Sequence, residues 1–172
     1  AACEGALLLV DAAQGVEAQT LANAYKAIEQ DLEIIPVINK IDLPSADIEG
    51  ARTQITDIIG LDGEHAVLTS AKEGRGTQEI LDALVARVPP PTGDRSGALK
   101  ALIFDAKYDP YRGVVVYVRV VEGRVATGQK LLFMGTGERH EVAELGGVRP
   151  AQQPPDALEA GEVGYLICNI KT

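Results

Sequence analysis

The first half of the chain alternates short apolar runs with longer segments whose apolar residues recur at helical spacing. The apolar runs cover residues 5–10, 32–38 and 66–68. The helical segments follow them, at residues 17–30, 47–59 and 77–88. A chain that repeats strand and helix in this order is expected to fold as a parallel sheet between two layers of helices, an α/β three-layer sandwich.

The apolar positions predict which surfaces are buried. Residues 5–10 are continuously apolar, which predicts a strand buried on both faces. The first helix is predicted to place four side chains on one face: Leu21, Ala24, Tyr25 and Ile28. The second is predicted to place Ala51, Ile55, Ile58 and Ile59 together and to stop at Gly60. The third is predicted to turn inward Ile80, Leu81, Leu84, Val85 and Val88.

The pattern changes after three consecutive prolines. These prolines, at positions 89–91, stiffen the chain and end the last helix, so residues 89–97 are predicted to be a linker. Short β-type runs then follow at residues 99–108, 113–121, 129–133, 140–145 and 162–170. Regular short strands with turns between them predict a closed all-β barrel. The expected organisation is an α/β domain over residues 1–88 and a barrel over residues 98–172.

Charge is distributed unevenly between these halves. Residues 1–88 carry 15 acidic and 6 basic side chains, whereas residues 89–172 carry 10 of each, so the net charge of -9 belongs to the first half. Such different balances favour two domains. Neither half has the basic excess of a free-standing nucleic-acid-binding domain, so any RNA contact is expected to be local or to be made by parts outside this sequence.

Cysteines and histidines do not indicate a metal site. Cys3 and Cys168 stand near opposite ends of the chain in apolar runs, and both are expected to be buried thiols. His65 and His140 have no ligand-like neighbours and are expected at the surface or in loops. No apolar run is long enough for a signal peptide or a membrane span.

Two polar motifs follow two of the predicted strands. Asn-Lys-x-Asp comes directly after residues 32–38, and Ser-Ala-Lys comes after residues 66–68. Ligands of parallel sheets bind at the carboxyl ends of the strands, where both motifs lie. An exposed turn would use similar residues, but it would not explain why a second motif follows one strand–helix unit later. This pair of motifs is typical of the guanine-binding site of GTPases.

The residue types suit the edge of a guanine base. Guanine presents two neighbouring donors, N1–H and the N2 amine, and a carboxylate at Asp42 can accept both. Adenine would leave that charged group unpaired, which costs about 1–3 kcal/mol or more. The Lys40 stem can lie along one base face, Asn39 can tie the loop to nearby backbone, and the Ala71 N–H can donate to O6. The predicted GTP- and GDP-binding residues are Asn39, Lys40, Asp42, Ser70, Ala71 and Lys72.

The phosphate-binding residues of a GTPase are missing from the sequence. Such enzymes need a Gly-x4-Gly-Lys-[Ser/Thr] loop, Mg²⁺ ligands and a group that orients the attacking water. Residues 123–130 have the two glycines, but Gln129 stands where the lysine is required, and two predicted strands flank the stretch, so we interpret it as turns. No catalytic residue or metal ligand is therefore predicted, and the chain alone is expected to be inactive. Asp11 also ends a strand, and a turn or helix-cap role is predicted for it.

Beyond these motifs, the chain resembles translational GTPases and, among them, the elongation factor 4 (LepA) family. Characteristic stretches include FDAKYDPYRGVV at residues 104–115 and others at residues 2–11, 14–23, 57–62, 134–137 and 161–165. The chain lacks an initial Met and runs directly into an apolar strand. We therefore expect a fragment that holds the C-terminal half of the GTP-binding domain and the following barrel.

The resemblance implies a cytoplasmic GTPase that can also lie at the inner face of the cell membrane. It would bind GTP with Mg²⁺, hydrolyse GTP on the ribosome and remodel tRNA-bearing elongation complexes, for example by back-translocation. The barrel would contact the small ribosomal subunit, and the protein would be a monomer off the ribosome. Two alternatives stay open from the sequence: a translation factor similar to elongation factor G, or a non-catalytic module that binds the ribosome or RNA. The intact Asp42 argues against the second, because a scaffold does not need a guanine-reading carboxylate.

Overall fold

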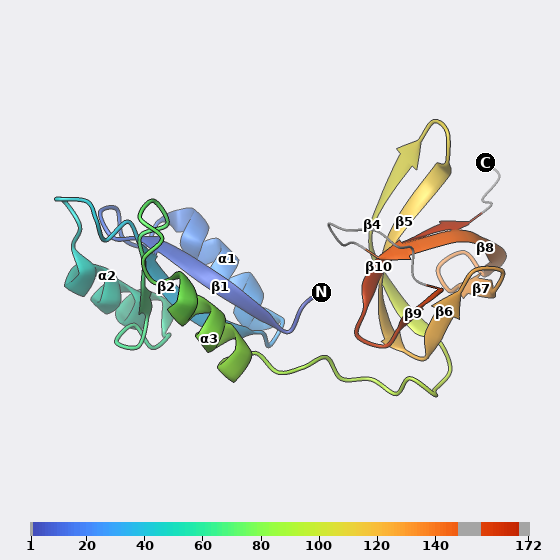
Figure 1. Ribbon diagram of the computed structural model, residues 1–172, viewed down its shortest axis with the longest axis horizontal. Coiled ribbons are helices and arrows are strands. Elements are labelled where there is room, and N and C mark those ends of the chain that lie inside the picture. Colours follow the sequence, from blue (N-terminus) through green and yellow to red (C-terminus); the bar gives the residue numbers. More distant parts are fainter. Residues whose placement is uncertain (1, 148–155, 169–172) are drawn as a thin grey trace. The chain divides into compact units, whose positions relative to one another are not determined.

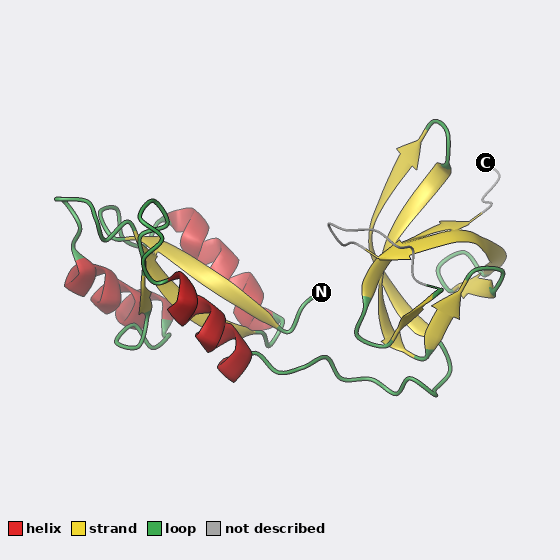
Figure 2. Ribbon diagram, viewed as in Figure 1, coloured by secondary structure: helices red, strands yellow, loops and turns green. Residues whose placement is uncertain are grey.

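The computed structural model describes residues 2–147 and 156–168, which divide into two compact units. One unit spans Cys3–Pro90, and the other begins at Pro91 (Figure 1). Within the described residues, helices occur only in the first unit, whereas strands occur in both (Figure 2).

The first unit is built on a parallel sheet. Its strands lie in the order β1 (Gly5–Asp11), β2 (Glu33–Asn39) and β3 (Val67–Leu68). Strand β1 pairs with β2 along its whole length. Strand β3 pairs with Val37 and Ile38, near the end of β2. The central strand β2 is the most deeply buried, because it has a neighbour on each side and helices on both faces.

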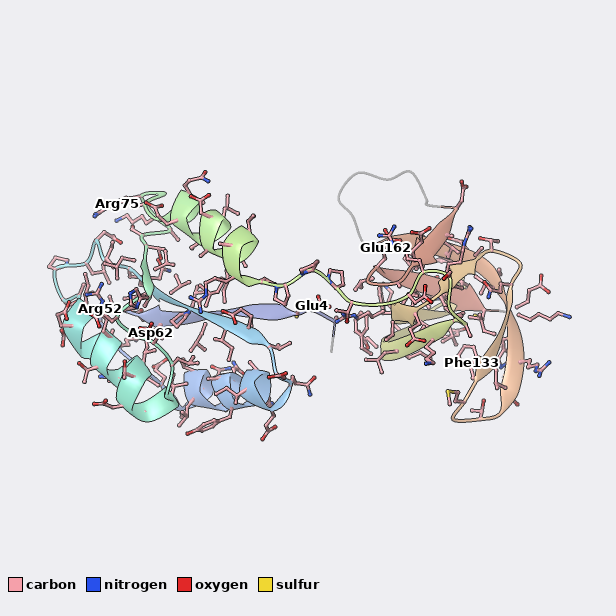
Figure 3. The ribbon with its side chains drawn as sticks, turned by 90° about the horizontal axis from the view of Figure 1, so that it is seen from below. Glu4, Arg52, Asp62, Arg75, Phe133 and Glu162 are labelled. Carbon is pink, nitrogen blue, oxygen red and sulfur yellow. The ribbon has the colours of Figure 1, made fainter. Side chains whose placement is uncertain are left out.

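Helices cover both faces of this sheet, which confirms the predicted three-layer α/β architecture. The helices α1 (Ala18–Glu29) and α2 (Ile48–Gln54) lie on one side, and α3 (Thr77–Arg87) lies on the other (Figure 3). Helix α2 continues as a short π-helix, η1 (Ile55–Ile59), and ends at Gly60 in the left-handed conformation, as the apolar pattern predicted. In one core cluster Leu8 and Ile34 of the sheet pack with Ala24 of α1 and Ile59 of η1.

Some predicted burial is wrong at the edges of this unit. Strand β1 is not buried on both faces: Leu7 and Leu9 are exposed, Leu9 by 56%, while Leu8 and Val10 are buried. The reason is that α3 contacts β2 and leaves that face of β1 uncovered (Figure 3). Five apolar helix residues that were predicted to face inward are also exposed in the structure: Tyr25, Ile28, Ile58, Leu81 and Val85.

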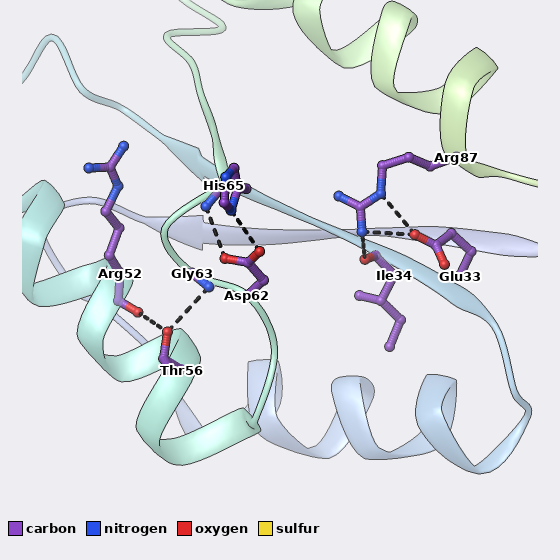
Figure 4. A network of polar contacts seen from close by, with 8 residues as sticks. All are labelled: Glu33, Ile34, Arg52, Thr56, Asp62, Gly63, His65 and Arg87. Atoms are coloured by element: carbon purple, nitrogen blue, oxygen red, sulfur yellow. Dashed lines mark hydrogen bonds and ion pairs between the residues drawn. The ribbon is translucent and has the colours of Figure 1, made fainter.

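Polar contacts fasten the helices and the connecting turn (Figure 4). The Arg87 side chain, at the end of α3, donates to Glu33 Oε1 at 2.9 Å and to the Ile34 carbonyl at 3.2 Å, which joins this helix to β2. After η1, the His65 N–H and ring bond the Asp62 carboxylate at 3.1 and 2.7 Å. These bonds shape the turn that leads into β3.

The second unit is an antiparallel half-barrel. Its main sheet has five strands, in the order β4 (Lys100–Asp109), β5 (Gly113–Glu122), β10 (Val163–Cys168), β8 (Glu138–Gly147) and β7 (Lys130–Phe133). Two short strands that the sequence pattern missed, β6 (Arg124–Ala126) and β9 (Ala157–Glu159), pair with each other. They contribute Val125 and Leu158 to the same core as Val118 of β5.

The all-β fold class is thus confirmed, although the predicted closed barrel is not seen in the described residues. Among the described strands no ladder joins β4 to β7, so the sheet is open rather than a closed ring. The end of the strand predicted over 162–170 lies outside the described residues. Part of the predicted linker also contacts the barrel, because the Gly123 N–H donates to the Asp94 carbonyl at 2.7 Å. We keep the domain division at residues 1–88 and 98–172 as a proposal.

Cysteine and histidine positions partly differ from expectation. Cys168 is buried, and burial raises the pKa of its thiol, but Cys3 is exposed. His65 is exposed, whereas His140 lies in β8 with its ring perpendicular to the ring of Phe133. No helix in residues 2–147 or 156–168 is long and apolar enough to span a membrane.

Two glycines before α3 allow a matched stability prediction. Gly74 and Gly76 both have positive φ, of 72° and 77°, but a Cβ at Gly76 would collide with the Leu68 carbonyl, whereas a Cβ at Gly74 meets nothing. We expect Gly76→Ala to destabilise the first unit by about 2–4 kcal/mol and Gly74→Ala by only about 1 kcal/mol. Urea unfolding followed by helix ellipticity measures this unit, because the described helices all lie in it. Equal losses for the two variants would contradict the predicted collision.

Candidate functional site

The loops that follow the three strands meet at one edge of the first sheet (Figure 1). The parallel register pairs Asp11 at the end of β1 with Asn39 at the end of β2, and Ile38 with Leu68 of β3. The Asn-Lys-x-Asp and Ser-Ala-Lys motifs begin at these strand ends, so the fold brings the two predicted loops together.

Asn39 ties the two loops to each other. Its side-chain oxygen Oδ1 accepts hydrogen bonds from the Thr69 hydroxyl at 3.2 Å and from the Ala71 N–H at 3.1 Å. The Thr69 carbonyl in turn accepts from the Ile41 N–H at 3.2 Å. The Asn39 side chain therefore holds the neighbouring loop.

The carboxylate of Asp42 is held by the neighbouring loop. The Ser70 hydroxyl, in a residue that is 0% exposed, donates to Asp42 Oδ1 at 2.6 Å and accepts from the Glu73 N–H at 3.2 Å. The hydrogen bond from Ser70 is the main cause that holds the pKa of Asp42 below its usual value, and the positive charges of Lys72 and Arg75 act in the same direction. Asp42 is thus an anion at neutral pH, and its two oxygens keep acceptor capacity beyond the bond from Ser70.

Lys40 has an unusual backbone and an ionic partner. Its φ is +66°, a conformation that residues other than glycine seldom adopt. Its ammonium Nζ lies 2.6 Å from Asp11 Oδ2, which raises the pKa of Lys40, while the bonds from Lys40 and from the Ala13 N–H lower the pKa of Asp11. The Lys40 side chain is 55% exposed and that of Asp11 only 16%.

Ala71 and Lys72 complete the edge of the site. Both residues are exposed, so a ligand can reach them from solvent. The Ala71 N–H already donates to Asn39, so it would have to share or exchange that bond to reach the oxygen of a base. Lys72 contributes positive charge near Asp42.

The arrangement offers an anionic acceptor, a lysine stem and backbone donors around an open edge, which suits a flat heterocycle with neighbouring N–H donors. Two participants were not among the predicted site residues. Thr69 is buried and joins the two loops, and its place directly before Ser70 was the available signal. Asp11 makes the predicted turn bond, to the Ala13 N–H at 2.8 Å, but also the ion pair with Lys40, which only the strand register reveals.

The glycine-containing stretch 123–130 does not enter this site. Gly123 and Gly128 have positive φ in the turns around β6, in agreement with the interpretation as turns. No group of three or more His, Cys, Asp or Glu side chains within the described part of the chain could hold a metal ion.

Comparison with protein families defines the class. The family model described as "Elongation factor Tu GTP binding domain" matches residues 1–90, and "Elongation factor Tu domain 2" matches residues 113–172. The chain belongs to this family of translational GTP-binding proteins.

Individual relatives narrow the resemblance to elongation factor 4. The chain is 59% identical over 171 residues to elongation factor 4 of Aquifex aeolicus and 60% identical over 171 residues to that of Bacillus subtilis. In both cases 99% of this chain is covered but only 28% of the relative, so the chain spans about a quarter of the length of these proteins. The fold is also that of the translation elongation factor SelB from Methanococcus maripaludis, with a TM-score of 0.83, 19% identity, and coverage of 98% of this chain and 37% of that chain.

Proposed function

We propose that this chain supplies the guanine-reading part of a ribosome-dependent GTPase of the elongation factor 4 type. The observation that carries the proposal is the Asp42 carboxylate, ionised and fixed by Ser70 at the carboxyl edge of a parallel sheet. A guanine base would present N1–H and its N2 amine to this carboxylate, and both bonds would be charge-assisted. An adenine base would present a lone pair at N1 instead, so it would be rejected.

The neighbouring residues have distinct parts in this proposal. Lys40 lays its methylene stem along one face of the base. Asn39 holds the loop of Ala71 next to the base, because its Oδ1 accepts the Ala71 N–H. The Ala71 N–H donates to guanine O6 when the base displaces or shares its bond to Asn39. Ser70 keeps Asp42 oriented, and Lys72 adds positive charge near the base carbonyl.

The chemistry of hydrolysis lies outside these residues. In the proposal, bound Mg²⁺ and a phosphate-binding loop supply the stabilisation of the transferring phosphoryl group. The residues of this chain fit the base of GTP or GDP, and we assign no phosphate or Mg²⁺ contact to them. Their contribution is to select guanine and to hold the nucleotide by its base.

The second unit provides the contact with the translation machinery in this account. We assign it to the small ribosomal subunit, because its fold matches domain 2 of the elongation factor Tu family. The full-length protein would act on tRNA-bearing elongation complexes, by remodelling or back-translocation, as a cytoplasmic monomer when it is off the ribosome.

The chain alone is expected to bind guanine nucleotides poorly. Helix N-termini and phosphate-binding loops supply much of the affinity for a nucleotide. A base pocket without such contacts is small and open, so it should bind weakly. Titration of a fluorescent GDP analogue into this chain and into the full-length protein measures the difference. In the full-length protein, we expect GDP but not ADP to compete with the fluorescent analogue. The chain alone is expected to show no sub-micromolar binding. Equal competition by ADP would contradict the proposed guanine site.

A further inference from the structure

Asp11 is a carboxylate at the strand edge that the guanine-binding proposal does not use. It ends β1, and the register places it beside Asn39, the residue before Lys40. One oxygen, Oδ1, accepts the Ala13 N–H at 2.8 Å, and the other, Oδ2, lies 2.6 Å from Lys40 Nζ. The carboxylate is therefore fixed by its own turn and presents its free oxygen to the lysine.

Lys40 needs such a partner if it is to hold one position. A lysine side chain is among the most costly to order, because its long flexible stem loses much of its rotamer freedom when it is fixed. The side chain of Lys40 is 55% exposed, so packing alone does not restrain it. Its left-handed backbone, with φ of +66°, sets where the stem starts, and the bond to Asp11 sets where it ends.

The pair contributes little to folding stability by itself. Ion pairs with one solvent-exposed partner typically contribute little to folding stability. The Asp11 carboxylate is nevertheless only 16% exposed and is fixed by a hydrogen bond from its own turn. A small gain in folding stability does not account for so defined a geometry. Its consequence is the placement of Lys40 at the edge where Asp42 also lies.

We propose that Asp11 is a positioning residue for guanine-nucleotide binding, which holds the Lys40 stem in place before the base arrives. The inference rests on the proposed function and adds to it a residue from a third strand end. Preorganisation of Lys40 lowers the ordering cost at binding, so Asp11 raises affinity without touching the nucleotide.

A double-mutant cycle on the full-length protein tests this role. Asp11→Asn keeps an acceptor for the Ala13 N–H but removes the charge that pairs with Lys40, and Lys40→Met keeps an apolar stem but removes the ammonium. We expect Asp11→Asn to weaken GDP binding about 3- to 10-fold in the Lys40 protein and less than about 2-fold in the Lys40→Met background. The urea midpoint of helix ellipticity is expected to be the same with and without Asp11→Asn.

The outcomes distinguish the positioning role of Asp11 from the guanine site itself. Equal weakening in both backgrounds, or no weakening at all, would overturn the positioning role while leaving the guanine site in place. GDP binding without preference over ADP in the unmodified protein would overturn the proposed function, and the inference with it.

Discussion

Replacing Asp42 by Asn in the full-length protein is expected to move its base preference from guanine to xanthine. Xanthine keeps N1–H but has a carbonyl where guanine has its N2 amine. An Asn amide offers one acceptor and one donor, which match xanthine, whereas its N–H would face a donor of guanine. The loss of charge-assisted bonds and the opposed donors are expected to weaken GTP binding about 30- to 1000-fold.

The structure indicates that this substitution leaves the rest of the site in place. An Asn side-chain oxygen can still accept the Ser70 hydroxyl that now bonds Asp42 Oδ1 at 2.6 Å. Phosphate contacts and the groups that perform hydrolysis would be unchanged, so XTP turnover should approach the original GTP rate.

Ribosome-stimulated hydrolysis of GTP and XTP by both proteins measures the change in preference. Asp62→Asn serves as the matched control, because Asp62 is an exposed carboxylate of the same unit that bonds His65. The control should retain preference for GTP. An Asp42→Asn protein that still prefers GTP would show that this residue does not read the base.

Asn39→Ala is expected to weaken binding of guanine and xanthine nucleotides alike, by about 10- to 100-fold. Asn39 accepts two hydrogen bonds from the neighbouring loop, at 3.2 Å from Thr69 and 3.1 Å from Ala71. Without this link both loops lose their relative placement, but neither donor of the base loses its acceptor. The effect should therefore be on affinity and not on base preference.

Thr69 provides the graded control for that prediction. Thr69→Ser keeps the hydroxyl that Asn39 accepts and should bind GDP nearly as well as the original protein. Thr69→Val removes one of the two bonds and should lose about 3- to 10-fold. Equilibrium GDP and XDP binding gives the affinities, and an Asn39→Ala protein that exchanges its base preference would contradict the linking role.

The order of strands and helices was predictable because hydrophobic spacing is a local property. Each apolar run and each helical stripe in residues 1–88 can be recognised from its own residues. The two motifs follow their strands in the sequence, so their place at the strand ends does not depend on how the helices pack. Which apolar side chains become covered depends on neighbours instead. Leu9 and Val85 look like core residues in the sequence, yet the structure leaves them 56% and 88% exposed.

Short elements and side-chain partners were beyond the sequence pattern for related reasons. Strands β6 and β9 have three residues each, too few to show a period of two, and they are recognisable only by their pairing. The predicted site residues follow strands in the sequence, so chain order alone placed them at one edge. The pairing of Lys40 with Asp11 depends on the parallel register of β1 and β2, which chain order does not contain.

The proposed selection of guanine depends on whether Asp42 accepts the N2 amine of the base. Inosine diphosphate differs from GDP only by the absence of that amine, so the ratio of GDP to inosine diphosphate affinity isolates one bond. The full-length protein is expected to favour GDP about 10-fold or more, and Asp42→Asn is expected to abolish or reverse that preference. The same ratio in both proteins would contradict the guanine-reading role of Asp42.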